Sequence, residues 1–163
     1  MKVVIFIGSE YDFDVVRDAI QIFKEFEVPF HLEVTSAHRS PDRTVNLIEK
    51  FEKQDAEIFI AVAGKAAHLA GVVAAHTLLP VIGVPVRGSS LSGLDALLST
   101  SQMPEGVPVA CMGIGKSGAS NAALLSIQIL ALKDPTLKER MREYRRQMAS
   151  RIEEASKKIQ ENL

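Results

Sequence analysis

The feature that most constrains the fold of this chain is a regular alternation of short apolar runs with longer segments of helical period. The runs are rich in β-branched and other apolar residues, which is typical of β-strands. They span residues 3–7, 31–35, 58–62, 81–86 and 107–112. Four of them are almost continuously apolar, as strands must be when helices cover both faces of a parallel sheet. The pattern therefore predicts an α/β fold with three layers.

The chain has 163 residues and contains no repeat, low-complexity tract or flexible linker that would divide it. A single hydrophobic core commonly serves about 100 to 200 residues before chains split into domains. We therefore expect one domain over residues 1–163. Within it, residues 1–133 form the α/β core and residues 134–163 form a C-terminal helix.

The C-terminal segment predicts one long helix. Asp134 suits the N-cap, Pro135 suits the first helical position, and no breaker follows up to Leu163. Its apolar residues recur at steps of three and four: Leu137, Met141, Tyr144, Met148, Ile152, Ala155, Ile159 and Leu163. Such a helix would be roughly 40 Å long, whereas the preceding core should have a radius of gyration of about 14 Å. A solvated, frayed tail is one interpretation; we favour a projecting helix that packs on a neighbouring subunit of a homo-oligomer.

Composition excludes several functional classes. An apolar share of 47% and a formal net charge of -1 argue against the basic surface that nucleic acid requires. Cys111 is the single cysteine, so no internal disulfide can form, and we expect a cytoplasmic protein. The most apolar stretch, residues 61–86, is interrupted by a lysine, two histidines and two prolines, so we expect no membrane span.

Ligands of an open parallel sheet bind beyond the carboxyl ends of its strands, so the loops after the strands are candidate sites. Residues 8–12 read Gly-Ser-Glu-Tyr-Asp and follow the first run. Their hydroxyl and backbone donors suit a phosphate or a ribose. Capping of the next helix by Ser9 or Asp12 explains the same residues equally well.

The loop after the second run concentrates more chemistry. Residues 36–41 read Ser-Ala-His-Arg-Ser-Pro, with a helix predicted from Pro41. Arg39 can bind a phosphate through two N–H groups and Ser36 can add a hydrogen bond. The imidazole of His38 suits proton transfer at neutral pH. The alternative is a surface loop with a solvated histidine and arginine.

The loop after the third run, residues 63–71, is built from small residues that let a ligand approach closely, Gly64 and Ala66 among them. Lys65 and His68 are its only charged or titratable groups. A lone histidine on an apolar helix is more often structural than catalytic, so we expect His68 only to line the pocket.

Residues 113–118 read Gly-Ile-Gly-Lys-Ser-Gly, which matches a dinucleotide fingerprint, and residues 110–117 fit a relaxed phosphate-loop pattern. Both motifs need a later strand bearing a carboxylate, and only helices are predicted to follow. We therefore interpret the glycines as a turn near a subunit contact or the active site. No metal-ligand motif and no Gly-x-Ser-x-Gly nucleophile motif is present, so a metal-free reaction is expected.

Several motifs occur in order along most of the chain. They are Gly-Ser-x-x-Asp at 8–12, Ser-Ala-His-Arg-Ser-Pro at 36–41, Ala-Ala-His-Leu at 66–69, Gln-Met-Pro at 102–104 and Asn-Ala-Ala at 121–123. Together they closely resemble the PurE family of aminoimidazole ribonucleotide mutases and carboxylases. The resemblance implies a flavodoxin-like fold and a homo-octamer with active sites between subunits.

The resemblance also implies a reaction and a set of roles. The bacterial mutases of the family convert N5-carboxyaminoimidazole ribonucleotide (N5-CAIR) to 4-carboxy-5-aminoimidazole ribonucleotide (CAIR) in purine biosynthesis, without metal, ATP or biotin. Ser9, Asp12, Ser36 and Arg39 would then surround the nucleotide, with Asp12 on the ribose. His38 would be the proton shuttle, and residues 64–71 would trap CO₂.

Lys65 departs from the pattern of the mutases, which usually have glycine there. A second class of the family carboxylates aminoimidazole ribonucleotide (AIR) directly with CO₂ and carries arginine at that position. That class usually reads Ser-Ala-His-Lys and lacks Ala-Ala-His-Leu, so we expect a mutase. A direct carboxylase and a non-catalytic nucleotide-binding subunit are the alternatives.

Overall fold

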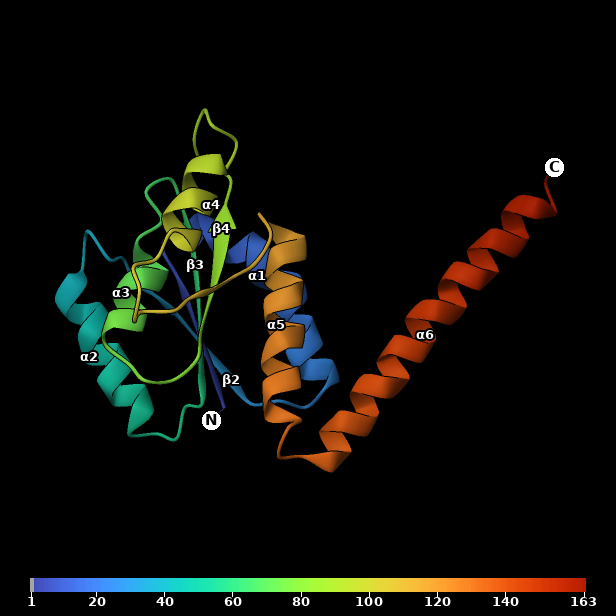
Figure 1. Ribbon diagram of the computed structural model, residues 1–163, viewed down its shortest axis with the longest axis horizontal. Coiled ribbons are helices and arrows are strands. Elements are labelled where there is room, and N and C mark those ends of the chain that lie inside the picture. The colour runs from blue at the N-terminus through green and yellow to red at the C-terminus, as the bar shows by residue number, and fades with distance from the viewer. Residues whose placement is uncertain (1) are drawn as a thin grey trace. The chain divides into compact units, whose positions relative to one another are not determined.

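The computed structural model describes residues 2–163, and the chain forms two compact units, one ending at Ser126 and one comprising residues 127–163. The first unit contains a five-stranded sheet in the order β2-β1-β3-β4-β5 (Figure 1). The strands are β1 (Val3–Ile7), β2 (Phe30–Val34), β3 (Ile58–Gly64), β4 (Val81–Val86) and β5 (Ala110–Cys111). All neighbouring pairs are parallel, which confirms the predicted sheet.

Burial along the strands follows their place in the sheet. Every residue of β1 and β4 is buried, as the continuous apolar runs predicted, whereas β2 is an edge strand whose residues are partly buried or exposed. The other edge strand is shorter than the predicted 107–112. Only Ala110 and Cys111 pair with β4, and Pro108 has no N–H to donate to a ladder.

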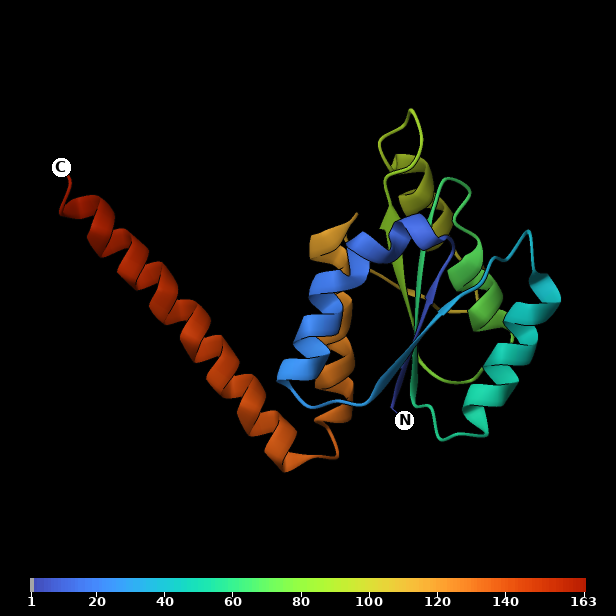
Figure 2. The ribbon, with the colours of Figure 1, turned by 180° about the vertical axis from the view of Figure 1, so that it is seen from behind.

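Helices cover both faces of this sheet, so the predicted three layers are confirmed (Figures 1 and 2). The helices of the first unit are η1 (Glu10–Asp12), α1 (Phe13–Glu25), α2 (Pro41–Glu52), α3 (Leu69–Ala75), α4 (Leu94–Ser101) and the start of α5 (Lys116–Leu130). Helices α2 and α3 pack on the face that carries Phe6 and Phe59, together with Phe51 of α2. The ring of Phe6 lies 6.3 Å from that of Phe51 and 5.5 Å from that of Phe59. Helix α1 covers the opposite face.

The second unit consists mainly of α6 (Pro135–Gln160). The side chain of Asp134 accepts a hydrogen bond of 3.0 Å from the backbone N–H of Leu137, so the predicted N-cap is confirmed. The helix has 26 residues and ends at Gln160, three residues before the predicted end. No helix within residues 2–163 is long and apolar enough to cross a membrane.

Candidate active site

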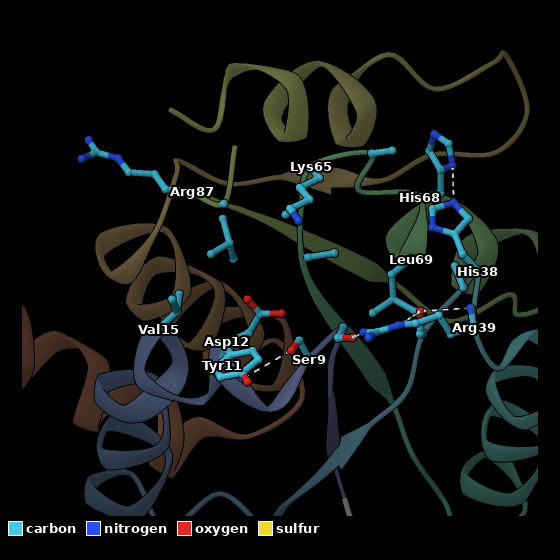
Figure 3. A pocket seen from close by; sticks show the side chains of 18 of the residues that line it. Ser9, Tyr11, Asp12, Val15, His38, Arg39, Lys65, His68, Leu69 and Arg87 are labelled. Atoms are coloured by element: carbon cyan, nitrogen blue, oxygen red, sulfur yellow. Dashed lines mark hydrogen bonds between the residues drawn. The ribbon is translucent and has the colours of Figure 1, made fainter. Parts of the chain in front are cut away.

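One cavity of about 770 Å³ lies where the carboxyl ends of β1, β2, β3 and β4 meet (Figure 3). This is the edge at which a parallel sheet collects its loops. All the site residues predicted from the sequence line this cavity: Ser9, Asp12, Ser36, His38, Arg39, Gly64, Lys65, Ala66 and His68. The fold therefore brings the three predicted loops together around a single space.

The loop after β1 serves both as a cap and as a wall of the cavity. The Ser9 hydroxyl accepts a hydrogen bond of 3.4 Å from the backbone N–H of Tyr11, so Ser9 caps the short η1 turn that precedes α1 and not α1 itself. Asp12 makes no such bond to α1. Burial raises the pKa of Asp12, although a backbone hydrogen bond from Ser9 and the charge of Arg39 oppose the shift. A half-buried carboxylate is thus left facing the cavity.

The loop after β2 is closed into a tight turn. Ser40 donates its backbone N–H to the carbonyl of Ser36 at 3.0 Å, and the Ser40 hydroxyl accepts from the backbone N–H of Ser36 at 3.0 Å. Below the turn, the buried hydroxyls of Thr35 and Thr44 lie 2.8 Å apart and join the end of β2 to α2. These bonds fix the backbone of the turn that carries His38 and Arg39.

Arg39 links the first two loops. Its guanidinium donates a hydrogen bond of 2.9 Å to the carbonyl of Gly8, and its backbone N–H donates to the Ser36 hydroxyl at 3.2 Å. A guanidinium has five N–H donors in a planar fork. Arg39 can therefore hold the loop after β1 and bind an anion in the cavity at the same time.

The structure brings His38 and His68 into direct contact. Nε2 of His38 lies 2.8 Å from Nδ1 of His68, and the two rings are nearly perpendicular, at 75° (Figure 3). The sequence predicted that both residues lie at the same edge of the sheet, but it gave His68 no role beyond lining the pocket. Only the side-chain geometry reveals the pair.

The loop after β3 combines close packing with a strained residue. A Cβ on Gly64 would lie 3.0 Å from the carbonyl oxygen of Val86, so glycine allows β4 to approach. Lys65 has a φ of 58°, a left-handed conformation that costs a non-glycine residue about 1 kcal/mol or more. This conformation occurs at the wall of the cavity, where strain often accompanies function.

Sequence reasoning missed Arg87, which also lines the cavity. It directly follows β4, so the same strand-end argument applied to the fourth run would have found it. It adds a second cation on the side of the cavity where Lys65 lies (Figure 3).

The glycine-rich segment at 113–118 lies outside the cavity lining. Lys116 pairs with Asp14 at 2.7 Å, and this hydrogen bond and charge lower the pKa of Asp14. A Cβ on Gly118 would lie 1.7 Å from the carbonyl oxygen of Gly113, so the glycine permits a tight turn into α5. Within residues 2–163 no three side chains of histidine, cysteine, aspartate or glutamate are grouped as a metal site.

Comparison with known proteins agrees with this site. Residues 2–151 match the family model described as AIR carboxylase. The chain is 46% identical to the N5-carboxyaminoimidazole ribonucleotide mutase of Pyrococcus horikoshii, covering 96% of this chain and 88% of that protein. It is 48% identical to the mutase of Methanocaldococcus jannaschii, covering 96% of both. The crystal structure of Treponema denticola PurE superimposes with a TM-score of 0.87 at 26% identity, covering 96% of this chain and 97% of that one. The chain therefore belongs to the AIR carboxylase family, which is the PurE family that its motifs resemble.

Proposed function

We propose that this chain is a mutase that converts N5-CAIR to CAIR in purine biosynthesis. The observation that carries the proposal is the cavity, which joins an anion-binding arginine, a half-buried carboxylate and an imidazole within one space. A phosphorylated ribonucleotide whose base undergoes proton transfer needs these groups. Curated relatives with 45 to 48% identity over most of the chain bear the name of this mutase.

The binding roles follow from the chemistry of each wall. Arg39 and Ser36 bind the substrate phosphate through charge-assisted hydrogen bonds. Ser9 adds a hydroxyl on the same side, and Asp12 accepts hydrogen bonds from the ribose hydroxyls. Gly64 and Ala66 leave room beside the imidazole ring of the substrate, where released CO₂ must be held.

In the proposed reaction His38 is the proton shuttle. The His38 imidazolium donates a proton to N5 as the N5–C bond to the carboxyl group breaks, which releases CO₂ inside the cavity. C4 of the base then attacks CO₂, and neutral His38 removes the proton from C4. The proton returns to His38, so no other reactant is consumed. A positioned acid/base supplies a factor of about 10² to 10⁴, and orientation of CO₂ against C4 must supply the rest.

We extend the proposal to assembly and location. The chain forms a cytoplasmic homo-octamer with active sites between subunits, as the family resemblance implies. The apolar residues Met148, Ile152 and Ile159 of α6 support an assembly, because 49%, 73% and 65% of their surfaces are exposed. The single cysteine suits a reducing compartment.

Lys65 favours a second candidate function, direct carboxylation of AIR with CO₂. Its cationic side chain at the cavity wall would attract a carboxylate that forms at C4. The names of the relatives favour the mutase. The two reactions differ in the substrate that they consume, so substrate choice distinguishes them.

The replacement His38→Asn tests whether the chain is an enzyme or only a nucleotide-binding subunit. We expect CAIR formation from N5-CAIR to fall by a factor of at least about 10², while CAIR binding, measured by calorimetry, stays within about threefold. His76→Asn is the matched control, because His76 is exposed and outside the cavity lining. Product formation by His38→Asn at the wild-type rate would contradict the role of His38. If the wild-type protein bound CAIR but formed none from N5-CAIR, the chain would instead be a non-catalytic nucleotide-binding subunit.

A further inference from the structure

The contact between His38 and His68 has the geometry of a hydrogen bond. The 2.8 Å separation of Nε2 and Nδ1 is within the range for N–H donors, and both side chains line the same cavity. The backbone holds both residues in place. His68 donates its N–H to the carbonyl of Ala66 at 2.8 Å, and His38 lies in the turn closed by Ser36 and Ser40.

A hydrogen bond between two imidazoles needs one N–H and one lone pair. A proton shuttle must alternate between imidazolium, with hydrogen on both nitrogens, and neutral imidazole, with hydrogen on one. If His68 donated to Nε2 of His38, two N–H groups would face each other whenever His38 became protonated. If His68 accepts instead, the bond persists in both states of His38. Only this direction lets the contact last through a catalytic cycle.

We propose that His68 is a positioning residue that accepts a hydrogen bond from Nε2–H of His38. The bond selects the tautomer of His38 whose free lone pair is on Nδ1, so Nδ1 is the nitrogen that exchanges the proton with the substrate. The inference rests on the proposed function, in which His38 is the shuttle.

Kinetics of His68→Leu and His68→Asn test the role. Leucine cannot accept a hydrogen bond, whereas the asparagine amide oxygen can lie near the position of Nδ1. We expect kcat for N5-CAIR to fall by a factor of about 10 to 100 in His68→Leu, as when an orienting partner is removed, with KM changed less than about threefold. His68→Asn should recover most of kcat. His76→Leu, at the other end of α3, should behave as wild type.

Either of two kinetic results would overturn the proposal: wild-type kcat in His68→Leu, or equal losses of kcat in the leucine and asparagine variants. If the leucine variant fails to fold, a spectroscopic test on the wild-type and asparagine proteins remains decisive.

That test uses nuclear magnetic resonance of ¹⁵N-histidine-labelled protein without substrate, with the His38 signals identified by their loss in His38→Asn. We expect hydrogen on Nε2 of neutral His38 in the wild-type and His68→Asn proteins, and slower exchange of that hydrogen with water than is found for the exposed imidazole of His76. Hydrogen on Nδ1, or exchange as fast as that of His76 in both proteins, would refute the bond. Because no turnover is measured, this result is independent of whether the mutase activity itself is found.

Discussion

Asp12 shows how a residue that is proposed to bind the substrate can oppose folding. Burial raises its pKa, so the ionised carboxylate is less favourable in the folded chain than in the unfolded one. At any pH above the folded-state pKa this difference lowers the free energy of unfolding. The penalty disappears as the pH falls below the ordinary value for aspartate, about 3.9. A ligand with ribose hydroxyls would offset it by donating hydrogen bonds to the carboxylate.

We therefore expect Asp12→Asn to increase the free energy of unfolding at about pH 7 while it weakens CAIR binding. The gain should stay under about 1 kcal/mol, because solvent screens a half-buried group, and it should vanish below about pH 3, where the carboxyl group is protonated in both the folded and the unfolded chain. Urea denaturation at both pH values and calorimetric titration with CAIR measure the two effects.

Asp14→Asn is the matched control, because it should change the free energy of unfolding in the opposite direction. Its pKa is lowered by the hydrogen bond and charge of Lys116, so its contribution to stability is present above the ordinary aspartate pKa and is lost as the pH falls through the folded-state pKa. Neutralising Asp14 should therefore lower stability slightly at neutral pH. A loss of stability in Asp12→Asn at neutral pH would contradict the burial explanation.

Sequence reasoning identified the residues of the cavity but not their mutual contacts. Ligands of a parallel sheet bind beyond the carboxyl ends of its strands, and this rule predicted that His38, Arg39 and Lys65 lie close together. The rule needs only the order of strands and loops. The bond from Arg39 to the Gly8 carbonyl and the left-handed backbone of Lys65 depend on loop conformations that no local pattern determines. Arg87 was within reach of the rule, yet its loop carried no recognisable motif.

At the scale of elements, two buried hydroxyls connect the loop that carries His38 to the sheet and to α2. Thr35 follows β2 and Thr44 lies in α2, and both side chains are almost fully buried. The Thr44 hydroxyl also lies within hydrogen-bond distance, 3.2 Å, of the carbonyl of Ser40, at the end of the turn. Their bond thus positions the turn that carries His38 and Arg39.

We expect Thr44→Val to lower the free energy of unfolding by about 1 to 3 kcal/mol, because it leaves the Thr35 hydroxyl buried without its partner. The KM for N5-CAIR should rise, since the turn is no longer held. The double variant Thr35→Val/Thr44→Val should be more stable than the single one, because replacing both members of a buried pair by apolar groups of similar shape can be nearly neutral. Urea denaturation measures the free energy of unfolding of both variants. A double variant less stable than Thr44→Val would contradict this explanation.

The elements themselves were largely predictable. The runs at 3–7 and 81–86 coincide with β1 and β4, because strands buried on both faces need an unbroken apolar sequence. The prediction was poorest at β5, where apolar residues at 107–109 resemble a strand but do not pair with β4. An edge position and a proline leave pairing to tertiary contacts that periodicity does not report.

At the scale of the whole molecule, α6 carries the proposal of an oligomer. Its apolar residues follow one stripe, and several are exposed in the single chain. Surface helices normally bury such a stripe against a partner. The exposed stripe therefore favours a helix that packs on a neighbouring subunit over a solvated tail.

We expect Ile152→Lys to reduce the assembly to smaller species in sedimentation velocity, because a charge would replace an apolar contact. Ser150→Lys adds the same charge about 160° around the helix, on the polar side, and should leave the sedimentation coefficient unchanged. Equal sedimentation of both variants and the wild-type protein would show that the stripe does not hold subunits together.

The most direct test of the proposed function is a paired ultraviolet assay for CAIR on the wild-type protein. One sample receives N5-CAIR, and the other receives AIR with physiological bicarbonate. A mutase should form CAIR rapidly from N5-CAIR and slowly or not at all from AIR, which would make Lys65 a tolerated substitution. Efficient use of AIR and CO₂ would instead assign direct carboxylation, and formation of CAIR in neither sample would contradict the catalytic role of this cavity.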